Sequence, residues 1–436
     1  MVENLHSITT YSTVVSNQSR RLFTFAVIFS VVGNIYAVGS LGFGEILIIL
    51  AIVLCMLMQG LVIRISVFDM KHSFTLFFIY AVIISLSVAM LFSRIPVSEA
   101  IERIIRDTFY VVVIFVFSAS FFERAYARRV IAWLSVALSV FVFIQFFAYL
   151  LFHIHFMGLI RFLPLASGES FIDLKNHYLK MASYQGYIRA NGFLDEPARC
   201  AHLLSVGLLV LFFSKHERYK GLKIVIVSVG MVLTTSLNAI LLLPVCFLIY
   251  YWFSLKQSGR KPKPWIVIFP IAALLAGIVA YFCIPMVQTI LQRLQNVKTT
   301  TQGSTVLRLL RGFAFYGKMP LWSKVFGIGV GNFLGFKDAF HIITPYEETT
   351  EYMNTLSYIL VSTGIVGTLL LAAAMRKLYK RTDVLGKSII LLLIVTSLSS
   401  SIYSTPYMII AMSFVITGVK AGRFPNDECI NRFQPQ

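Results

Sequence analysis

Two carboxylates and two guanidinium groups lie close together in the stretch from Arg189 to Arg199. Asp195 and Glu196 stand directly before Pro197. Guanidinium groups bind phosphate or sugar oxygens, and a carboxylate such as Glu196 can accept a proton from a hydroxyl group or bind a sugar. The same residues also suit a capped helix N-terminus at a membrane interface, because proline fits the first turn and acidic side chains favour that end. Both interpretations stay open on these residues alone.

A second pair of arginines, Arg308 and Arg311, lies in a stretch whose helical pattern runs to about Tyr316. Residues three apart on an α-helix are neighbours, so the spacing predicts that both guanidinium groups project from one face. Paired planar guanidinium groups bind phosphate oxygens better than lysines do. The alternative is an amphipathic surface helix whose arginines reach toward lipid headgroups.

Downstream, the stretch Gly327–Phe333 alternates glycine with other residues. Its exposed backbone N–H groups could hold an anion, or the glycines could simply permit a tight turn. Three carboxylates follow at Glu347, Glu348 and Glu351, and a solvated face is the ordinary interpretation of such a run. Asn354, at the start of the next apolar run, is the more plausible polar ligand of a substrate.

Other kinds of chemistry have little support in the sequence. His153 and His155 are two residues apart, nothing nearby completes a metal site, and we expect no metal. Within the apolar runs, charge is almost absent apart from Glu45 and Arg64, which counts against an ion-coupled transporter. We interpret the five cysteines as packing residues; they are Cys55, Cys200, Cys246, Cys283 and Cys429.

The composition requires a membrane. The chain has 436 residues, of which 58% are apolar and 13% charged, whereas roughly 25% of residues are charged in an ordinary soluble protein. A soluble enzyme, a disordered chain and a disulfide-rich secreted domain are excluded, because a soluble fold cannot cover that much apolar surface. The net charge of +19 is explained by basic cytoplasmic loops rather than by nucleic acid.

The apolar runs predict an all-α polytopic membrane protein with about twelve transmembrane helices (range ten to fourteen) in a single integral domain, residues 1–436. The expected spans are 22–41, 44–66, 73–92, 105–122, 130–152, 198–214, 222–237, 238–254, 265–284, 353–373, 388–402 and 405–419. Most of the 38 Lys and Arg residues fall in cytoplasmic segments if both termini are cytoplasmic. Two long outer segments, 153–197 and 285–352, then face the periplasm of a bacterium and hold the chemistry.

Three stretches, in this order, resemble the Wzy-type O-antigen and exopolysaccharide polymerases and the related O-antigen ligases. Arg189–Pro197 is similar to the family's R-x-x-G-x-x-x-E-P pattern. The stretch from Ser304 through Arg308, followed by Gly327–Phe333, looks like the family's arginine helix and G-x-G-x-G-N-F segment. The run from Asn354 to Gly367 resembles its helix with an early asparagine and a later G-x-x-G.

This resemblance implies a GT-C-like glycosyltransferase of the bacterial inner membrane that uses no metal and no cofactor. Its donor would be a growing glycan on undecaprenyl pyrophosphate, and its acceptor a new lipid-linked repeat unit. Arg308 and Arg189 would bind the pyrophosphate, with Arg311 secondary, because fixed guanidinium groups stabilise the leaving phosphate. Glu196 would be the base, a task that suits a carboxylate whose pKa is raised by partial burial. Asp195, Arg199 and Asn354 complete the expected substrate-binding set.

The sequence also departs from the family pattern. The histidine that ligases carry directly before the asparagine is replaced by Met353, which favours a polymerase over a ligase. The alternatives are an O-antigen ligase that transfers polymer to lipid A–core, and a lipid-linked oligosaccharide flippase or transporter. A chain-length regulator and a flippase are expected partners by analogy with the family.

Overall fold

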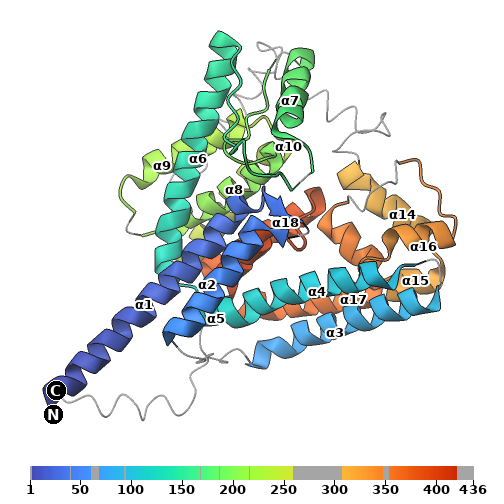
Figure 1. The fold of residues 1–436 in the computed structure, drawn as a ribbon, viewed down its shortest axis with the longest axis horizontal. Helices are drawn as coiled ribbons and strands as arrows, with labels where there is room; N and C mark the ends of the chain where they lie inside the picture. The colour runs from blue at the N-terminus through green and yellow to red at the C-terminus, as the bar shows by residue number, and fades with distance from the viewer. Residues whose placement is uncertain are drawn as a thin grey trace.

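The computed structural model describes residues 2–39, 41–59, 68–92, 95–166, 168–185, 187–215, 217–258, 307–346 and 353–419. In chain order, its helices are α1 (Val2–Gly33), α2 (Phe43–Gln59), α3 (Phe68–Leu91), α4 (Val97–Val112), the π-helical turn η1 (Val113–Phe117), α5 (Ser118–Phe121), α6 (Arg124–Phe152), α7 (Phe171–Gln185), α8 (Pro197–Phe213), α9 (Lys220–Leu233), α10 (Leu237–Ser258), the π-helical turn η2 (Leu307–Arg311), α14 (Gly312–Lys318), α15 (Leu321–Phe326), α16 (Phe333–Ala339), α17 (Thr355–Arg381), α18 (Val384–Ser399) and α19 (Pro406–Ile416). The described part of the chain is thus almost wholly helical (Figure 1).

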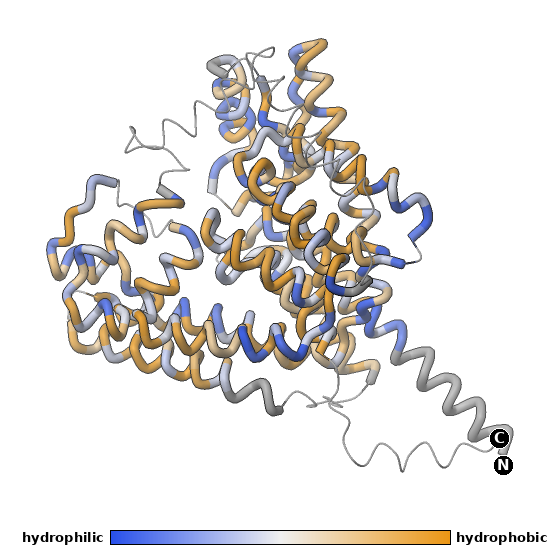
Figure 2. Tube along the Cα trace, turned by 180° about the vertical axis from the view of Figure 1, so that it is seen from behind, coloured by the Kyte–Doolittle hydropathy of each residue, from blue (hydrophilic) through white to orange (hydrophobic). Residues whose placement is uncertain are grey.

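Five of these helical segments are long and apolar enough to cross a membrane. They are Ser73–Leu91, Val97–Phe121, Arg124–Phe152, Leu237–Lys256 and Thr355–Arg381. Many large apolar side chains on them point outward, Leu91 and Phe152 among them. The tube in Figure 2 is apolar along most helices, and its polar colours gather mainly at helix ends and connections. These are the features of an all-α membrane protein, whose outer surface is covered by lipid.

The helices pack around two apolar clusters. The larger one joins α1, α2, α6, α8, α9, α10, α18 and α19 with the η1 turn. The smaller one joins the end of α3, the beginning of α4, the short helices α14 and α16 and the first half of α17. Figure 1 shows α3, α4 and α17 lying side by side, with α14–α16 near one end of them. The segment 312–339, which includes the glycine run Gly327–Phe333, therefore packs against one end of α3, α4 and α17.

Several expected spans have different bounds. The helices found for 130–152 and 353–373 are longer and run from Arg124 to Phe152 and from Thr355 to Arg381. The span expected at 22–41 ends at Gly33, because the chain then forms a short antiparallel hairpin of β1 (Ala37–Val38) and β2 (Leu41–Gly42). The span expected at 105–122 begins earlier, at Val97 in α4. The first half of α4 is amphipathic, so its charged residues hid the helix start from a search for apolar runs.

The charges on α4 correct the expectation that the spans carry almost none beyond Glu45 and Arg64. Arg106 forms an ion pair with Glu45 of α2, with 2.9 Å between Nη2 and Oε1. Asp107 is only 4% exposed and accepts hydrogen bonds from the hydroxyl groups of Tyr403 and Ser404. Each buried carboxylate thus has partners, as its desolvation requires.

Several other predicted boundaries are confirmed. Pro197 occupies the first turn of α8, where its missing N–H costs nothing. The turn between the expected spans 222–237 and 238–254 is found at Thr234–Ser236, between α9 and α10. Asn354 caps α17, since its Oδ1 accepts a hydrogen bond from the backbone N–H of Ser357. The segment 153–197, expected to be a long loop, also contains a helix, α7.

Helix α17 is interrupted at one residue. Gly364 has φ +64° and ψ −169°, which an L-amino acid with a side chain rarely adopts. A Cβ atom there would lie 2.4 Å from the carbonyl oxygen of Val325 and 2.5 Å from the backbone nitrogen of Gly327. The break thus lets the segment after α15 approach α17 at backbone distance.

Some predictions lie outside the described residues. They are the expected span 265–284, the charge of Arg64, Ser304, the carboxylates Glu347, Glu348 and Glu351, and the cysteines Cys283 and Cys429. The other three cysteines, Cys55, Cys200 and Cys246, are buried free thiols.

Candidate active site

The stretch before α8 is held against α6. Gln145 of α6 donates from Nε2 to the carbonyl oxygen of Gly192 (2.8 Å) and accepts from its N–H (2.7 Å). Asn191 closes the turn by donating to the carbonyl oxygen of Leu194 (2.6 Å). These hydrogen bonds fix the turn that precedes Asp195 and Glu196 at the N-terminus of α8.

Glu196 meets Arg308 there. The guanidinium Nη2 of Arg308 donates a hydrogen bond to Oε1 of Glu196, and the two side chains form an ion pair. Arg308 is 112 positions away in the chain and comes from the η2 turn. The structure therefore joins the two stretches that stood out in the sequence at one point.

Arg308 and Arg311 do not act as a pair from one helix face. They lie in a π-helical turn rather than in an α-helix, so residues three apart diverge more widely around the axis. The side chain of Arg311 is 1% exposed, and its guanidinium carbon lies 5.6 Å from the ring centroid of Phe333. Arg311 is therefore a buried residue that packs on an aromatic ring, and it is absent from the cavity that Arg308 lines.

That cavity has a volume of about 240 Å³. It lies among the end of α1, the N-terminal turns of α8, the beginning of α19 and the connection between α18 and α19 (residues 400–405), which we call the 400–405 connection. We call it the polar cavity. The side chains and backbone that line it belong to Val31, Asn34, Glu196, Ala198, Arg199, His202, Arg308, Ser400, Ser401, Ile402, Thr405, Pro406 and Tyr407.

The pKa values of the two neighbouring carboxyl groups before α8, Asp195 and Glu196, shift in opposite directions. Burial would raise the pKa of Glu196, but the charge and hydrogen bond of Arg308 outweigh it and bring the pKa below its ordinary value. Burial raises the pKa of Asp195 despite the nearby Arg199 guanidinium. The expectation of a raised pKa at Glu196 is therefore wrong, because the sequence did not show that Arg308 would contact it.

The other expected site residues occupy distinct places. Arg199 lines the polar cavity and forms an ion pair with Asp195, 2.8 Å from Nη1 to Oδ2. Arg189 is half-buried outside the cavity lining, and its Nε makes no hydrogen bond within the described part of the chain. Asn354 is fully buried and donates from Nδ2 to the carbonyl oxygen of Arg308 (2.8 Å), so it holds Arg308 rather than facing the cavity.

Three polar residues that the sequence analysis passed over lie at this site: His202 and Ser400 line the polar cavity, and Asn238 lies behind them. His202 of α8 lies with its Nε2 3.1 Å from Oγ of Ser400, and Asn238 of α10 donates from Nδ2 to the same Oγ (2.7 Å). Each stands within or at the end of an apolar run, where a lone polar residue ordinarily indicates helix packing. Thr355 ties this group to α17, because its N–H and hydroxyl group both donate to the Ser400 carbonyl oxygen (3.0 Å each).

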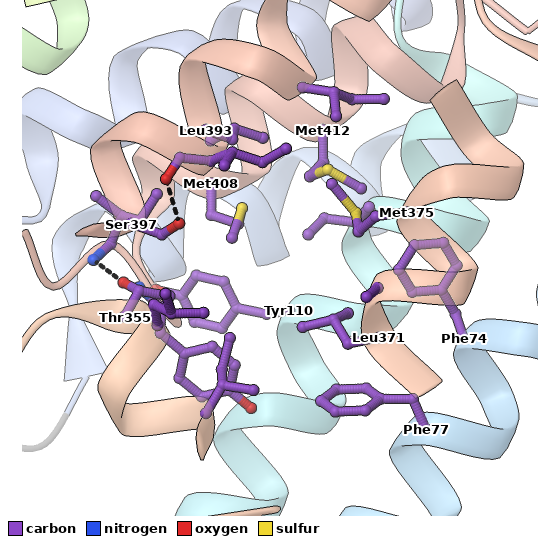
Figure 3. A pocket seen from close by; sticks show the side chains of 18 of the residues that line it. Phe74, Phe77, Tyr110, Thr355, Leu371, Met375, Leu393, Ser397, Met408 and Met412 are labelled. Atoms are coloured by element: carbon purple, nitrogen blue, oxygen red, sulfur yellow. Dashed lines mark hydrogen bonds between the residues drawn. The ribbon is translucent and has the colours of Figure 1, made fainter. Parts of the chain in front are cut away.

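A larger cavity adjoins the polar one. It has a volume of about 590 Å³ and lies among α3, α4, α17, α18 and α19. Figure 3 shows Phe74, Phe77, Met375, Met408 and Met412 around it. Its lining is almost entirely apolar, apart from groups such as Asp107, Tyr403 and Ser404. We call it the apolar cavity.

One residue of the 400–405 connection, Ile402, lines both cavities. This connection is fixed from two sides. The hydroxyl oxygen of Thr355 accepts from the N–H of Ile402 (2.7 Å), and Asp107 accepts from the hydroxyl group of Tyr403 (2.8 Å). The 400–405 connection, held by these hydrogen bonds, thus lies between the polar cavity and the apolar cavity.

The first four residues of the glycine run, Gly327–Val330, use their backbone N–H groups in hydrogen bonds within the protein. The N–H groups of Ile328 and Gly329 donate to carbonyl oxygens of α17, and that of Val330 donates to Oγ of Ser85 in α3 (2.8 Å). Gly327, Gly329 and Gly331 all have positive φ, and a Cβ on Gly329 would lie 2.3 Å from Cα of Ser85. Close packing between helices, and not anion binding, explains these glycines.

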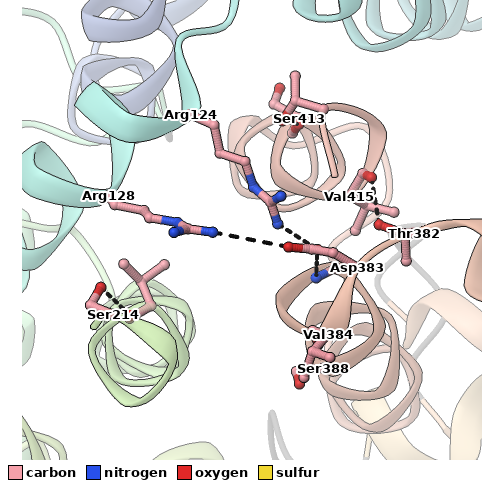
Figure 4. Close-up of polar contacts among 12 residues, drawn as sticks. Arg124, Arg128, Ser214, Thr382, Asp383, Val384, Ser388, Ser413 and Val415 are labelled. Atoms are coloured by element: carbon pink, nitrogen blue, oxygen red, sulfur yellow. Dashed lines mark hydrogen bonds and ion pairs between the residues drawn. The ribbon is translucent and has the colours of Figure 1, made fainter. Parts of the chain in front are cut away.

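A separate ion-pair cluster joins the beginnings of α6 and α18. Arg124 donates from Nη2 to Oδ1 of Asp383 (2.6 Å), and Nη2 of Arg128 lies 4.0 Å from the other carboxylate oxygen (Figure 4). Asp383 also caps α18 by accepting from the N–H of Gly386 (2.9 Å). The Asp383 carboxylate already interacts with two guanidinium groups and one backbone N–H group. We therefore interpret this cluster as a structural contact between α6 and α18 rather than as a binding site.

Comparison of the sequence with protein-family models and with curated proteins finds no match.

Proposed function

We propose that the protein is a bacterial surface-polysaccharide polymerase. It transfers a growing glycan from undecaprenyl pyrophosphate onto a new lipid-linked repeat unit and forms a glycosidic bond. The observation that carries this proposal is the contact between Arg308 and Glu196. It brings an anion-binding group and a carboxylate, from the two stretches that resemble the polymerase and ligase family, to one cavity between apolar helices.

The pair of adjoining cavities suits an amphipathic substrate. A pyrophosphate and the first sugar need charged and polar partners, which Arg308, Arg199 and Glu196 supply in the polar cavity. A polyprenyl chain needs apolar contacts, which the apolar cavity supplies next to Ile402. A substrate with both parts matches this pairing of a polar and an apolar cavity on the two sides of Ile402.

The reaction needs charge stabilisation and one proton acceptor. The acceptor hydroxyl oxygen forms a bond to the anomeric carbon, the bond from that carbon to the pyrophosphate oxygen breaks, and the pyrophosphate leaves with the electron pair. The guanidinium groups of Arg308 and Arg199 stabilise the charge on the leaving group. Glu196 receives the hydroxyl proton.

The ion pair links these two tasks. While Arg308 contacts Glu196, the pKa of this carboxyl is held below its ordinary value. A bound pyrophosphate competes for the same guanidinium group, and the burial of Glu196 then raises its pKa. The carboxylate thereby becomes a stronger base only after the donor has bound.

The same proposal includes the topology and the partners. Twelve spans with both termini in the cytoplasm place the polar cavity at the periplasmic face of the inner membrane. The partners are lipid-linked repeat units, membrane lipid, a chain-length regulator and the flippase that supplies the repeat units.

A surface-polysaccharide gel tests the function. The gene is deleted in its own bacterium and restored as wild type, as Arg308→Ala, or as Arg129→Ala. Arg129 is an exposed residue at the beginning of α6, away from the cavity, and serves as the matched control. Wild type and Arg129→Ala should restore the ladder, whereas Arg308→Ala should leave core plus one repeat unit at an unchanged protein level.

Other outcomes point elsewhere. Polymer that accumulates on the lipid carrier without reaching lipid A–core would indicate a ligase. Repeat units that accumulate on the cytoplasmic side would indicate a flippase. A normal ladder from the Arg308→Ala protein would overturn the proposal for this residue.

A further inference from the structure

His202 occupies the polar cavity without a role in the mechanism above. It lies on the same face of α8 as Ala198 and Arg199, one turn further along, and all three residues line the cavity. Its side chain is 5% exposed, so any group that meets it must enter the cavity.

One ring nitrogen of His202 is already occupied. Nε2 lies 3.1 Å from Oγ of Ser400 and 3.4 Å from Nδ2 of Asn238. The Asn238 amide nitrogen can only donate a hydrogen bond, and it also donates to Oγ of Ser400 (2.7 Å). Nε2 therefore faces donors and acts as an acceptor, which places the ring proton on Nδ1 in the neutral imidazole.

The Nδ1–H group has no hydrogen-bond acceptor within the described part of the chain. The ring shares its cavity with the guanidinium groups of Arg199 and Arg308. Three side chains that can donate hydrogen bonds thus line one small chamber beside the single Glu196 carboxylate. Such a lining suits an acceptor with several oxygens, and a phosphoryl group has this character.

We propose that His202 donates its Nδ1–H to a phosphoryl oxygen of the lipid-linked substrate in the polar cavity, and that Ser400 and Asn238 fix it as a donor. This inference rests on the proposed function of the cavity. The ring is a neutral donor held by α8, α10 and the 400–405 connection, so it does not need to reorient when the pyrophosphate departs.

Two substitutions separate donation from packing. In His202→Asn, the side-chain amide takes the place of Nδ1–H, while the contact with Ser400 is lost. In His202→Gln, the longer amide reaches Ser400 and Asn238, while the donor at the Nδ1 position is lost. The measurements are the affinity of the full-length protein in nanodiscs for undecaprenyl pyrophosphate and the ladder in cells.

The donor role predicts that His202→Asn binds within a few-fold of wild type and restores the ladder. His202→Gln should bind at least about 10-fold more weakly, with an unchanged melting temperature. The opposite pattern would show that His202 serves only the packing with Ser400. Equal loss in both variants, or loss in neither, would also overturn the inference.

The Arg308→Ala protein distinguishes this failure from a failure of the proposed function. If Arg308→Ala binds undecaprenyl pyrophosphate as wild type does, the cavity is not a pyrophosphate site and the proposed function is wrong. If Arg308→Ala loses binding while the His202 pair contradicts the donor role, only the inference about His202 is wrong.

Discussion

Asn354 holds Arg308 by its backbone. The side-chain amide and the backbone N–H of Asn354 both donate to the carbonyl oxygen of Arg308, at 2.8 and 3.0 Å. The side-chain oxygen of Asn354 meanwhile caps α17. One buried side chain therefore sets the position of the arginine relative to a membrane-spanning helix.

Asn354→Asp should separate these two tasks. The carboxylate still accepts from the N–H of Ser357, but it cannot donate to the Arg308 carbonyl oxygen and is repelled by it. We expect polymer synthesis to fall on the order of 10- to 100-fold while the melting temperature falls by only a few degrees. Asn354→Ala, which also loses the cap, should lose about a further 1 kcal/mol of stability. An Asp variant as active as wild type would contradict this positioning role.

The ion pair of Glu196 predicts a specific pH dependence. The pKa of Glu196 in the folded protein lies below its ordinary value near 4.5, since Arg308 outweighs burial. The pair thus contributes its full stability above pH 4.5 and loses it as the pH falls through the folded-state pKa. Thermal unfolding should show Glu196→Gln about 2 kcal/mol less stable than wild type at neutral pH, with the difference shrinking below pH 4.5.

Asp195→Asn is the matched control, because burial raises the pKa of its neighbour Asp195 above 3.8. The contribution of that carboxyl to stability is present below pH 3.8 and is lost as the pH rises through its folded-state pKa. Relative to wild type, Asp195→Asn should gain stability as the pH rises. Parallel pH profiles for the two variants would refute the opposite pKa directions.

His155 should make the wild-type protein sensitive to acid. The ring is buried against Tyr178, with 5.9 Å between centroids, and neither nitrogen has a hydrogen-bond partner within the described residues. Burial, with the charge of Lys175, lowers the pKa of His155 to about 4. Stability should therefore be lost as the pH falls from about 6.5 to about 4, by up to about 1.4 kcal/mol per pH unit.

His155→Phe should remove this slope, because phenylalanine fills a similar space and takes up no proton. His177→Phe, at an exposed position of α7, is the control and should leave the wild-type slope in place. Thermal unfolding at pH 4.5, 5.5 and 6.5 distinguishes the three proteins. An unchanged slope in His155→Phe would assign the acid sensitivity to other groups.

Gly329 and Gly317 make a matched pair for the packing role of the glycine run. A Cβ on Gly329 would lie 2.3 Å from Cα of Ser85 at φ +85°, so Gly329→Ala should destabilise the fold by more than about 2 kcal/mol. A Cβ on Gly317, within α14, meets nothing within 4 Å. Gly317→Ala should therefore be neutral or stabilise by up to about 1 kcal/mol. The amount of folded protein in detergent and its melting temperature report both effects.

The sequence was most informative where a local rule applies. Proline at the first turn predicts the start of α8, and apolar runs predict most of the described helices. The π-helical turn at Leu307–Arg311 has no such signal, because hydrophobic spacing fits an α-helix equally well, and the relative directions of Arg308 and Arg311 were consequently wrong. Asp107 was overlooked because it stands at the edge of an apolar run, where a charge is ordinarily solvated.

The candidate site was predictable only in part, because sequence spacing groups residues within one segment but does not show contacts between distant segments. Residues at one end of one segment, such as Asp195, Glu196 and Arg199, can be grouped by spacing alone. The direction of the pKa shift at Glu196 depends on Arg308, which comes from another part of the chain. The hydrogen bonds among His202, Asn238 and Ser400 form only because the fold brings α8, α10 and the end of α18 together, so spacing in the sequence does not indicate them.

The close approach at Gly364 limits how this chain can diverge. A Cβ atom at Gly364 or at Gly327 would overlap with the backbone of the facing segment. A larger residue at one position cannot be accommodated by a smaller one at the other, because glycine is already the smallest residue. Ordinary drift therefore stops at both positions, while the apolar surfaces around them are free to exchange one aliphatic residue for another. Distant descendants of a common ancestor would keep this pair of glycines long after their helices had lost recognisable similarity.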